Sequence, residues 1–235
     1  MTSFALRLLD RFAHDRPLPD PLPDGPMAIV LAWFNEAQAA KQQPNPNAMY
    51  LATAASDASP SVRAVLCKGI DALAASLEFY TNYESRKAGE LDASHKASVL
   101  FHWDHADRQI RVEGVVTRCT PEESDRYFES RRWESRVGAT ASDQSRPIES
   151  RRALLDKVAA AVNKLGLDAA VLLAGGNANI PRPPHWGGYR LWASRIELWQ
   201  GGTGRVHDRA EWRRDLTATS SGFTGGPWRS TRLQP

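Results

Sequence analysis

Cations and hydroxyl groups are concentrated between residues 61 and 87. Arg63 and Lys68 stand near the two ends of an apolar segment, and Arg86 and Lys87 open a predicted helix that follows a second strand. Helix-start amides and guanidinium groups supply directed hydrogen-bond donors, and lysines supply point charge. This stretch therefore predicts a site for an anionic ligand, with phosphate as the first candidate. A hairpin at a sheet edge, with its charges in water, would explain the same residues.

The spacing of Arg63 and Lys68 adds a constraint. They are separated by an odd number of positions, so strict alternation along a strand sends them to opposite faces of a sheet. They would share one pocket only if a bulge or a strand end turned one of them. Otherwise they would serve different ligands or different chains of a dimer.

A second group of polar residues lies on predicted helices. Tyr127, Arg131 and Ser135 follow one another at intervals of four, so the first two share one helix face. A tyrosine hydroxyl beside a guanidinium can hold a phosphate, although an ordinary surface helix would also explain the pair. Gln144 and Ser145 precede another predicted helix, and Ser145 is a candidate cap.

A third group lies toward the C-terminus. Arg205, His207 and Arg209 alternate, so an extended chain would project all three to one side. Three cations on one face are unfavourable unless anions or π-systems meet them. His207 is therefore a candidate site residue. Gln109 lies on the polar face of a predicted strand, and it becomes a candidate site residue if a ligand with amide-like edges lies over it. No Ser-His-Asp order, metal-binding motif or phosphate-binding glycine loop appears in the sequence.

The elements that would position these residues are mainly strands. Many strands, few helices and no strand–helix alternation argue against a doubly wound fold and favour a closed or nearly closed antiparallel barrel with helices at its margins. Residues 1–25 are expected to form a flexible, proline-rich arm, and residues 26–235 a single domain. Residues 175–179 and 217–226 read as low-order insertions. The expected strands are 49–55, 61–69, 77–82, 97–103, 109–119, 186–192, 195–200, 210–214 and 228–233, and the expected helices start at Pro26 and cover 84–93, 121–131 and 148–165.

Composition limits the class of protein. With 235 residues and a net charge of +3, the chain is long enough for one domain and is weakly basic without a lysine-rich block, which argues against nucleic acid as a partner. Cys67 and Cys119 form no metal-ligand pattern, so a reduced, cytoplasmic protein without a metal site is expected. No apolar run is long enough to span a membrane, and the start lacks the features of a signal peptide.

Together these stretches resemble one known family, that of pyridoxine/pyridoxamine 5'-phosphate oxidase. The matching stretches occur in the family's order and cover the chain from about residue 47 to its end. They are RAVLCK (63–68), FYTNYESRK (79–87), RQIRVEG (108–114), YFESR (127–131), QSRPI (144–148), PHWGGYR (184–190), IELWQG (196–201) and RVHDR (205–209). The resemblance implies a mainly β (α+β) fold: an FMN-binding split barrel with peripheral helices, forming a homodimer with FMN at the subunit interface.

The resemblance also implies roles for individual residues. Arg63, Arg86 and Lys87 would bind the FMN phosphate, and Gln109 would meet the edge of the flavin. The full set of implied FMN contacts is Arg63, Ala64, Val65, Leu66, Cys67, Lys68, Tyr80, Thr81, Arg86, Lys87, Gln109, Gln144, Ser145, Trp199 and Arg209. The substrate phosphate would be held by Lys68, Tyr127, Arg131 and Ser135, and Arg205 and His207 would act catalytically over the pyridine ring.

The implied reaction oxidises pyridoxamine 5'-phosphate or pyridoxine 5'-phosphate to pyridoxal 5'-phosphate by hydride transfer to the flavin. Molecular oxygen reoxidises the flavin and gives hydrogen peroxide, and the amine substrate also releases ammonia. Two alternatives stay open: a related split-barrel flavin oxidase for another substrate, such as a phenazine precursor, and a non-catalytic protein that binds FMN or pyridoxal phosphate. Residues 132–140 depart from the family pattern, which lends the last alternative its best support and puts the geometry of that loop in doubt.

Overall fold

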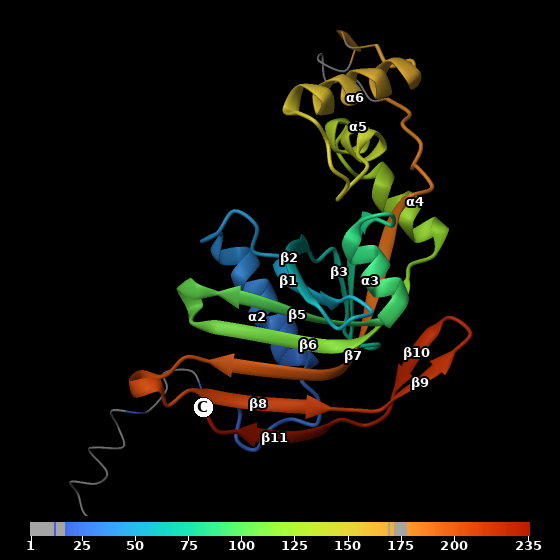
Figure 1. Ribbon diagram of the computed structural model, residues 1–235. Helices are drawn as coiled ribbons and strands as arrows, with labels where there is room; N and C mark the ends of the chain where they lie inside the picture. The colour runs from blue at the N-terminus through green and yellow to red at the C-terminus, as the bar shows by residue number, and fades with distance from the viewer. Residues whose placement is uncertain (1–11, 13–16, 169, 172–177) are drawn as a thin grey trace, which may run out of the picture.

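The computed structural model describes residues 12, 17–168, 170–171 and 178–235. Nine antiparallel strands form one strongly curved sheet, a half-barrel (Figure 1). Seven of them follow the order β11-β8-β7-β6-β5-β1-β2. β4 pairs with the first half of β7, on the edge that β8 uses along the second half, and β3 pairs with β4. The strands are β1 (Ala48–Ala54), β2 (Pro60–Leu66), β3 (Gly69–Asp71), β4 (Ser76–Asn82), β5 (Lys96–Trp103), β6 (Arg108–Arg118), β7 (Trp186–Gln200), β8 (Asp208–Arg213) and β11 (Arg229–Leu233). The predicted split-barrel fold class is confirmed.

The long strand β7 organises the sheet. The sequence predicts two strands, at 186–192 and 195–200, whereas the structure contains one, which pairs with β4 through its first half and with β8 through its second. β6 accompanies it along both halves and has a register shift between Glu113 and Gly114. A Cβ on Gly114 would lie 1.8 Å from the carbonyl oxygen of Trp192, so only glycine permits this close approach of the two strands.

Five helices accompany the sheet in the described part of the chain. They are α2 (Met27–Ala40), α3 (Arg86–Ser94), α4 (Pro121–Glu129), α5 (Trp133–Ala141) and α6 (Arg151–Lys164). α2 packs on the sheet, whereas α5 and α6 project from one end of it beyond α4 (Figure 1). None of the described helices is both long and apolar enough to cross a membrane.

Local capping explains where two of these helices begin. Helix α4 begins at Pro121, as the sequence predicts, and Thr120 and Glu123 form a reciprocal capping box at its start. The helix expected from residue 148 instead begins at Arg151, because the Ser150 hydroxyl accepts a hydrogen bond from the Ala153 amide. The prediction of Ser145 as the cap is therefore wrong.

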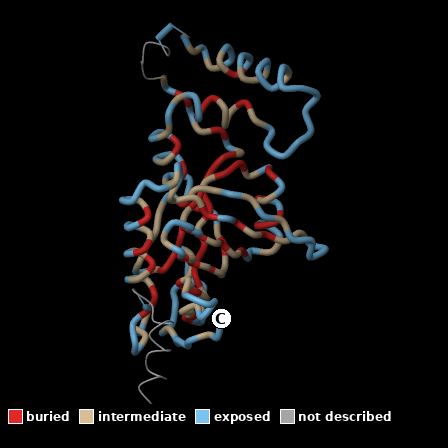
Figure 2. Tube along the Cα trace, turned by 90° about the vertical axis from the view of Figure 1, so that its left-hand side faces the viewer, coloured by how far each residue is buried: buried red, intermediate tan, exposed pale blue. Residues whose placement is uncertain are grey.

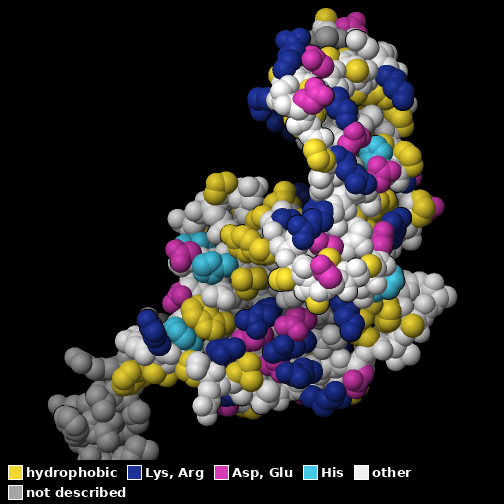
Figure 3. Space-filling model, in the orientation of Figure 1, with side chains coloured by type: hydrophobic (Ala, Val, Ile, Leu, Met, Phe, Trp, Pro, Cys, Tyr) yellow, Lys and Arg dark blue, Asp and Glu magenta, His cyan; other side chains and the backbone are white. Residues whose placement is uncertain are grey.

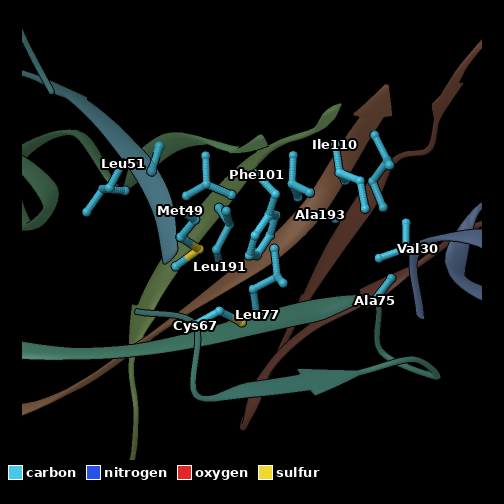
Figure 4. Packing of buried hydrophobic residues seen from close by; sticks show 14 of the residues in the cluster. Val30, Met49, Leu51, Cys67, Ala75, Leu77, Phe101, Ile110, Leu191 and Ala193 are labelled. Atoms are coloured by element: carbon cyan, nitrogen blue, oxygen red, sulfur yellow. The ribbon is translucent and has the colours of Figure 1, made fainter. Parts of the chain in front are cut away.

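The main core lies inside the half-barrel and beneath α2. Alternating residues of the strands fill it, including Met49, Leu51, Phe101, Ile110 and Leu191 (Figure 4). A second, smaller cluster around Phe128, Val137 and Trp186 joins α4 and α5 to the start of β7. The projecting helix α6 is exposed along most of its length (Figure 2).

One predicted surface feature differs from expectation. Residues 217–226 form a β-hairpin of β9 (Leu216–Thr219) and β10 (Gly222–Gly225), in which the Phe223 ring lies 6.2 Å from that of Trp192. The other predicted insertion, 175–179, lies mostly outside the described residues. The division into an arm (1–25) and a domain stays a prediction, although Leu18 is only 3% exposed and joins the main core.

Candidate functional site

A cavity of about 620 Å3 opens between the edge strand β2, strand β4 and helices α4 and α5. Most of its lining residues belong to the predicted site, and they come from segments far apart in the sequence. The lining consists of Ala64, Val65, Leu66, Lys68, Tyr80, Thr81, Lys87, Tyr127, Ser130, Arg131, Arg132, Ser135, Gln144 and Trp186. The predicted substrate-phosphate set, Lys68, Tyr127, Arg131 and Ser135, is therefore gathered in one place.

Arg131 is the most informative side chain of this cavity. Its guanidinium lies 4.7 Å from the centre of the Trp186 ring, and its Nη1 atom is buried without a hydrogen-bond partner among the described residues. Burial lowers the pKa of Arg131. A buried donor without an acceptor is costly, so this arrangement is suited to an anionic ligand that supplies the missing acceptor.

Three aromatic rings form one wall of the cavity. The rings of Tyr80 and Tyr127 stack at 4.0 Å with an interplanar angle of 26°, and Trp186 lies nearly parallel to Tyr80 at 5.6 Å. The Lys68 ammonium lies 5.7 Å from the centre of the Tyr127 ring. Cations and aromatic faces are thus combined in one cavity, as a flat ligand with an anionic group requires.

Lys87 links the cavity to the first turn of α3. Its ammonium donates to Gln144 Oε1 at 2.6 Å and to the hydroxyls of Thr81 and Ser85 at 3.1 Å. Burial, together with the charge of Arg63, lowers the pKa of Lys87 to about 8. The predicted residues Thr81, Lys87 and Gln144 therefore form one hydrogen-bonded group at the cavity edge.

Arg63 and Arg86 lie beside this group and outside the cavity lining. Both contact the carboxylate of Glu90: Arg86 Nε at 2.8 Å and Arg63 Nη2 at 3.2 Å. Lys68, which follows the end of β2, lines the cavity, whereas Arg63 does not. The two cations therefore do not line one cavity, but Lys68 lies beyond the strand, so the argument from strand parity stays a prediction.

Four of the remaining predicted residues, Gln109, Trp199, His207 and Arg209, form a separate patch, here called the β6–β8 patch, and Arg205 precedes it in the turn after β7. Gln109, Trp199 and Arg209 are register neighbours on three adjacent strands. The His207 ring lies 4.6 Å from that of Trp199, and its Nδ1 accepts a hydrogen bond from the Gly202 amide at 3.1 Å. The neutral imidazole therefore carries its proton on Nε2. Positive and negative side chains surround the patch on this face of the sheet (Figure 3).

The predicted extended run from Arg205 to Arg209 is wrong. Arg205 ends a 3-10 turn (Thr203–Arg205) and has a φ of 64°, so it does not alternate with His207 and Arg209 along a strand. The glycines at 201, 202 and 204 explain the turn, because they allow the chain to leave the extended conformation immediately after β7.

Two predicted cofactor residues lie away from both places. The Cys67 side chain is buried in the main core, where burial raises the pKa of its thiol to about 12. Ser145 lies in a neighbouring hollow with Asp143, Arg146 and Lys157. Neither side chain lines the cavity, so a contact from either to a cofactor stays a prediction.

Several residues at or beside the cavity were not predicted from the sequence. Trp186, Ser130 and Arg132 line the cavity, and Glu90 with Thr53 holds Arg63. Trp186 belongs to the quoted stretch PHWGGYR, which signals it, whereas Glu90 looks like an ordinary helix-surface residue in the sequence. The 132–140 segment, which the sequence analysis takes as a loop, is mostly helix α5, so that expectation is wrong. Helix α5 brings Ser135 to the cavity. No three His, Cys, Asp or Glu side chains group closely enough to hold a metal ion in the described ranges.

The curved antiparallel sheet and the cavity at its edge define a split-barrel protein with a site suited to an anionic aromatic ligand. The chain belongs to the pyridoxamine 5'-phosphate oxidase family. The family model described as pyridoxamine 5'-phosphate oxidase matches residues 36–164, and the one described as the pyridoxine 5'-phosphate oxidase C-terminal dimerisation region matches residues 186–235. The predicted family is thereby confirmed, and the second match supports the predicted homodimer.

Related proteins align with this chain over nearly its whole length. A pyridoxine/pyridoxamine 5'-phosphate oxidase from Cupriavidus metallidurans is 45% identical over 216 residues, which cover 92% of this chain and 91% of that protein. A pyridoxine/pyridoxamine 5'-phosphate oxidase from Novosphingobium aromaticivorans is 46% identical over 211 residues, which cover 89% of this chain and 93% of that protein. The crystal structure of PhzG from Burkholderia lata in complex with tetrahydrophenazine-1-carboxylic acid is similar with a TM-score of 0.78 and 30% identity, covering 94% of this chain and 98% of that chain.

Proposed function

We propose that the protein oxidises pyridoxamine 5'-phosphate and pyridoxine 5'-phosphate to pyridoxal 5'-phosphate with FMN as cofactor and O2 as electron acceptor. The alcohol and O2 give the aldehyde and hydrogen peroxide; the amine, O2 and water give the aldehyde, ammonia and hydrogen peroxide. The observation that carries this proposal is the cavity in which Nη1 of Arg131 is buried without a hydrogen-bond partner among the described residues, beside Lys68, Tyr127 and Ser135. That donor set suits a phosphate monoester on a flat ring.

The substrate phosphate would be bound by Arg131 and Lys68 as charge partners, with the hydroxyls of Tyr127 and Ser135 as further donors. The near-parallel rings of Tyr127 and Trp186 would restrict the plane of a bound pyridine ring. These contacts fix the position and orientation of the substrate before reaction, which is a large part of what a protein contributes to cofactor chemistry.

The residues present fit FMN. Lys87, Arg63 and Arg86 gather near the start of α3, where helix-start amides and cations suit a phosphate. The backbone of Ala64, Val65 and Leu66 on the edge strand β2, and Gln144 opposite, would border the flavin. Gln109, Trp199 and Arg209, with Cys67, Tyr80, Thr81 and Ser145, complete the proposed set. FMN supplies a two-electron acceptor that O2 can reoxidise.

His207 in the β6–β8 patch and Arg205 in the preceding turn are both absent from the cavity lining of their own chain. We infer that a homodimer joins the cavity of one protomer to this patch of its partner, as a two-fold axis would do at both sites at once. Arg205 would then lie over the pyridine ring, and the Nε2–H group of His207 would orient the 4' substituent. The two free cysteines are consistent with the cytoplasmic location that we also propose.

A phenazine-type oxidase is the second candidate, because PhzG aligns over almost the whole chain. The ligand of that complex, tetrahydrophenazine-1-carboxylic acid, has a carboxylic acid group and no phosphate. We favour the phosphorylated substrate because the cavity gathers two cations and two hydroxyls, Lys68, Arg131, Tyr127 and Ser135, more than one carboxylate needs.

The test begins with the colour and spectrum of the purified protein. A yellow dimer should bleach when pyridoxamine 5'-phosphate is added without oxygen, and should form pyridoxal 5'-phosphate and peroxide in air. A yellow protein that does not bleach would be a binding protein. Bleaching only with a dihydrophenazine carboxylate would favour the second candidate.

The shared site is tested by mixing two variants, each impaired in a different way, and assaying them at substrate concentrations well below the wild-type KM. Arg131→Met and Arg205→Leu lie in different halves of the proposed site, so a mixed dimer contains one intact site. Random exchange at equal concentrations should restore about a quarter of the wild-type activity, because half of the dimers are mixed. Arg205→Leu alone should retain its flavin and lose turnover. Activity that stays absent after demonstrated subunit exchange would refute the shared site.

A further inference from the structure

The carboxylate of Glu90 lies where strands β1 and β2 meet the first turns of α3. It is 5% exposed, its Oε1 accepts from Arg86 Nε at 2.8 Å, and its Oε2 lies 3.2 Å from Arg63 Nη2. The Thr53 hydroxyl donates to the same Oε2. A buried carboxylate is stable only when it is paired and hydrogen-bonded, and here all these partners come from the region of the proposed FMN phosphate.

The two arginines are held in different ways. Both terminal nitrogens of Arg63 are engaged by protein acceptors: Nη1 by Leu51 O and Thr53 Oγ1, and Nη2 by Ser61 Oγ and Glu90. Arg86, by contrast, is bound to Glu90 through Nε, and its side chain is 61% exposed. Among the described residues its terminal nitrogens have no hydrogen-bond partner, so the end of the guanidinium fork is left for an external acceptor.

Glu90 also acts on the neighbouring lysine. Burial and the charge of Arg63 lower the pKa of Lys87, and the negative charge of Glu90 opposes this effect. Three cations therefore lie close together around one carboxylate. Without it, Arg63 and Lys87 would repel each other with less compensation, and Arg86 would lose the contact that orients it.

We propose that Glu90 is a positioning residue for the FMN phosphate, which aligns the Arg86 guanidinium through Nε so that its terminal nitrogens meet the phosphate. This inference rests on the proposed function. Two effects of removing Glu90 oppose each other: an acidic group disappears near an anion, and the alignment of Arg86 is lost. The alignment dominates, because water screens charge at the exposed Arg86 whereas a bidentate contact to phosphate depends on geometry.

The test compares FMN with riboflavin, which lacks the phosphate, on the flavin-free full-length protein. Dissociation constants come from flavin fluorescence for the wild type, Glu90→Gln and Glu90→Ala. The matched control is Asp92→Asn on the same helix, whose carboxylate contacts Arg118 at 2.6 Å and Tyr189 at 2.9 Å, away from the proposed phosphate. Glu90→Ala should weaken FMN binding about tenfold and riboflavin binding by less than about twofold, and the control should change neither.

Each other outcome is decisive. Equal weakening of both flavins would make Glu90 a merely structural residue, and unchanged or tighter FMN binding would mean that its charge matters more than its alignment of Arg86; either result overturns the inference. If circular dichroism shows that Glu90→Ala does not fold, Glu90→Gln, which keeps the side-chain shape, decides between these outcomes. A wild-type protein that binds neither flavin would overturn the proposed function itself, which distinguishes the two failures.

Discussion

Replacing Arg131 by methionine should lower the ligand affinity of the protein and leave its stability without ligand nearly unchanged. The guanidinium is partly buried, its Nη1 has no acceptor among the described residues, and burial lowers its pKa, so the charge is unfavourable when no ligand is bound. Leaving such a donor unpaired costs about 1–3 kcal/mol. The contact with the Trp186 ring at 4.7 Å returns about 0.5–2 kcal/mol. These contributions nearly cancel, and methionine keeps most of the packing.

The ligand-free Arg131→Met protein should therefore be as stable as the wild type to within about 1 kcal/mol, or slightly more stable. Binding of a phosphorylated ligand should suffer, because a charge-assisted hydrogen bond contributes about 1.5–3 kcal/mol. That loss corresponds to an affinity for pyridoxal 5'-phosphate, and an inverse KM for pyridoxamine 5'-phosphate, lower by about 10- to 150-fold.

Urea unfolding of the flavin-free proteins and calorimetric titration with pyridoxal 5'-phosphate would measure the two effects. Arg126→Met, at an exposed position of helix α4 and outside the cavity lining, is the matched control and should leave both unchanged. A variant that lost more than about 2 kcal/mol of stability but kept its affinity would refute the reasoning, because Arg131 would then be a structural cation.

Three further predictions address other parts of the molecule. The pKa of Lys87 falls to about 8 from its ordinary value of 10.5, so between these pH values the unfolded chain binds more protons than the folded protein. The stability of the flavin-free protein should therefore rise with pH in this range. FMN affinity should fall above about pH 8, and Lys87→Arg should abolish that fall. Gly114→Ala should lower the free energy of unfolding, measured in urea, by about 3 kcal/mol or more, because its Cβ would meet the Trp192 carbonyl oxygen at 1.8 Å. Gly138→Ala, with open space within α5, should leave that free energy unchanged or raise it by up to about 1 kcal/mol. Burial raises the pKa of both Cys67 and Cys119 to about 12, so neither thiol should react with a disulfide reagent at pH 8 until the protein unfolds, and rapid modification of the native protein would contradict their placement.

The strands were the most predictable elements of the fold. Ile110 and Val112 face the core while Gln109 and Arg111 face outward, as their alternation predicts, and residues 96–103 pair with 108–115. The hairpin at 216–225 was missed because its Thr, Ser and Gly residues resemble a loop, and its stabilising contact, between Phe223 and Trp192, joins residues 31 positions apart. Such a long-range contact leaves no local signal in the sequence.

The candidate site was predictable in part. The spacing of Tyr127 and Arg131 predicts one helix face, but α4 ends at Glu129, and the turn after it brings Arg131 to the cavity beside Tyr127. Only the tertiary fold brings Lys68, from the segment after β2, to the same cavity. The turn at Arg205 was missed because alternation was read through a glycine-rich segment, where the backbone is free to leave the extended conformation. Glu90 was missed because burial and its pairing with Arg63, from another element, make it unusual, and neither is visible in the sequence.

The two groups of cations differ in the partners that the protein provides for them. Arg63 and Arg86 share an internal carboxylate, so the proposed FMN phosphate site is largely formed before any ligand arrives. Arg131 has no such partner for Nη1 among the described residues, so its cavity becomes fully hydrogen-bonded only with a substrate anion present. A preorganised site loses less conformational freedom on binding than one that the ligand must complete. The arrangement therefore favours a cofactor that stays bound through many turnovers and a substrate and product that exchange at each one.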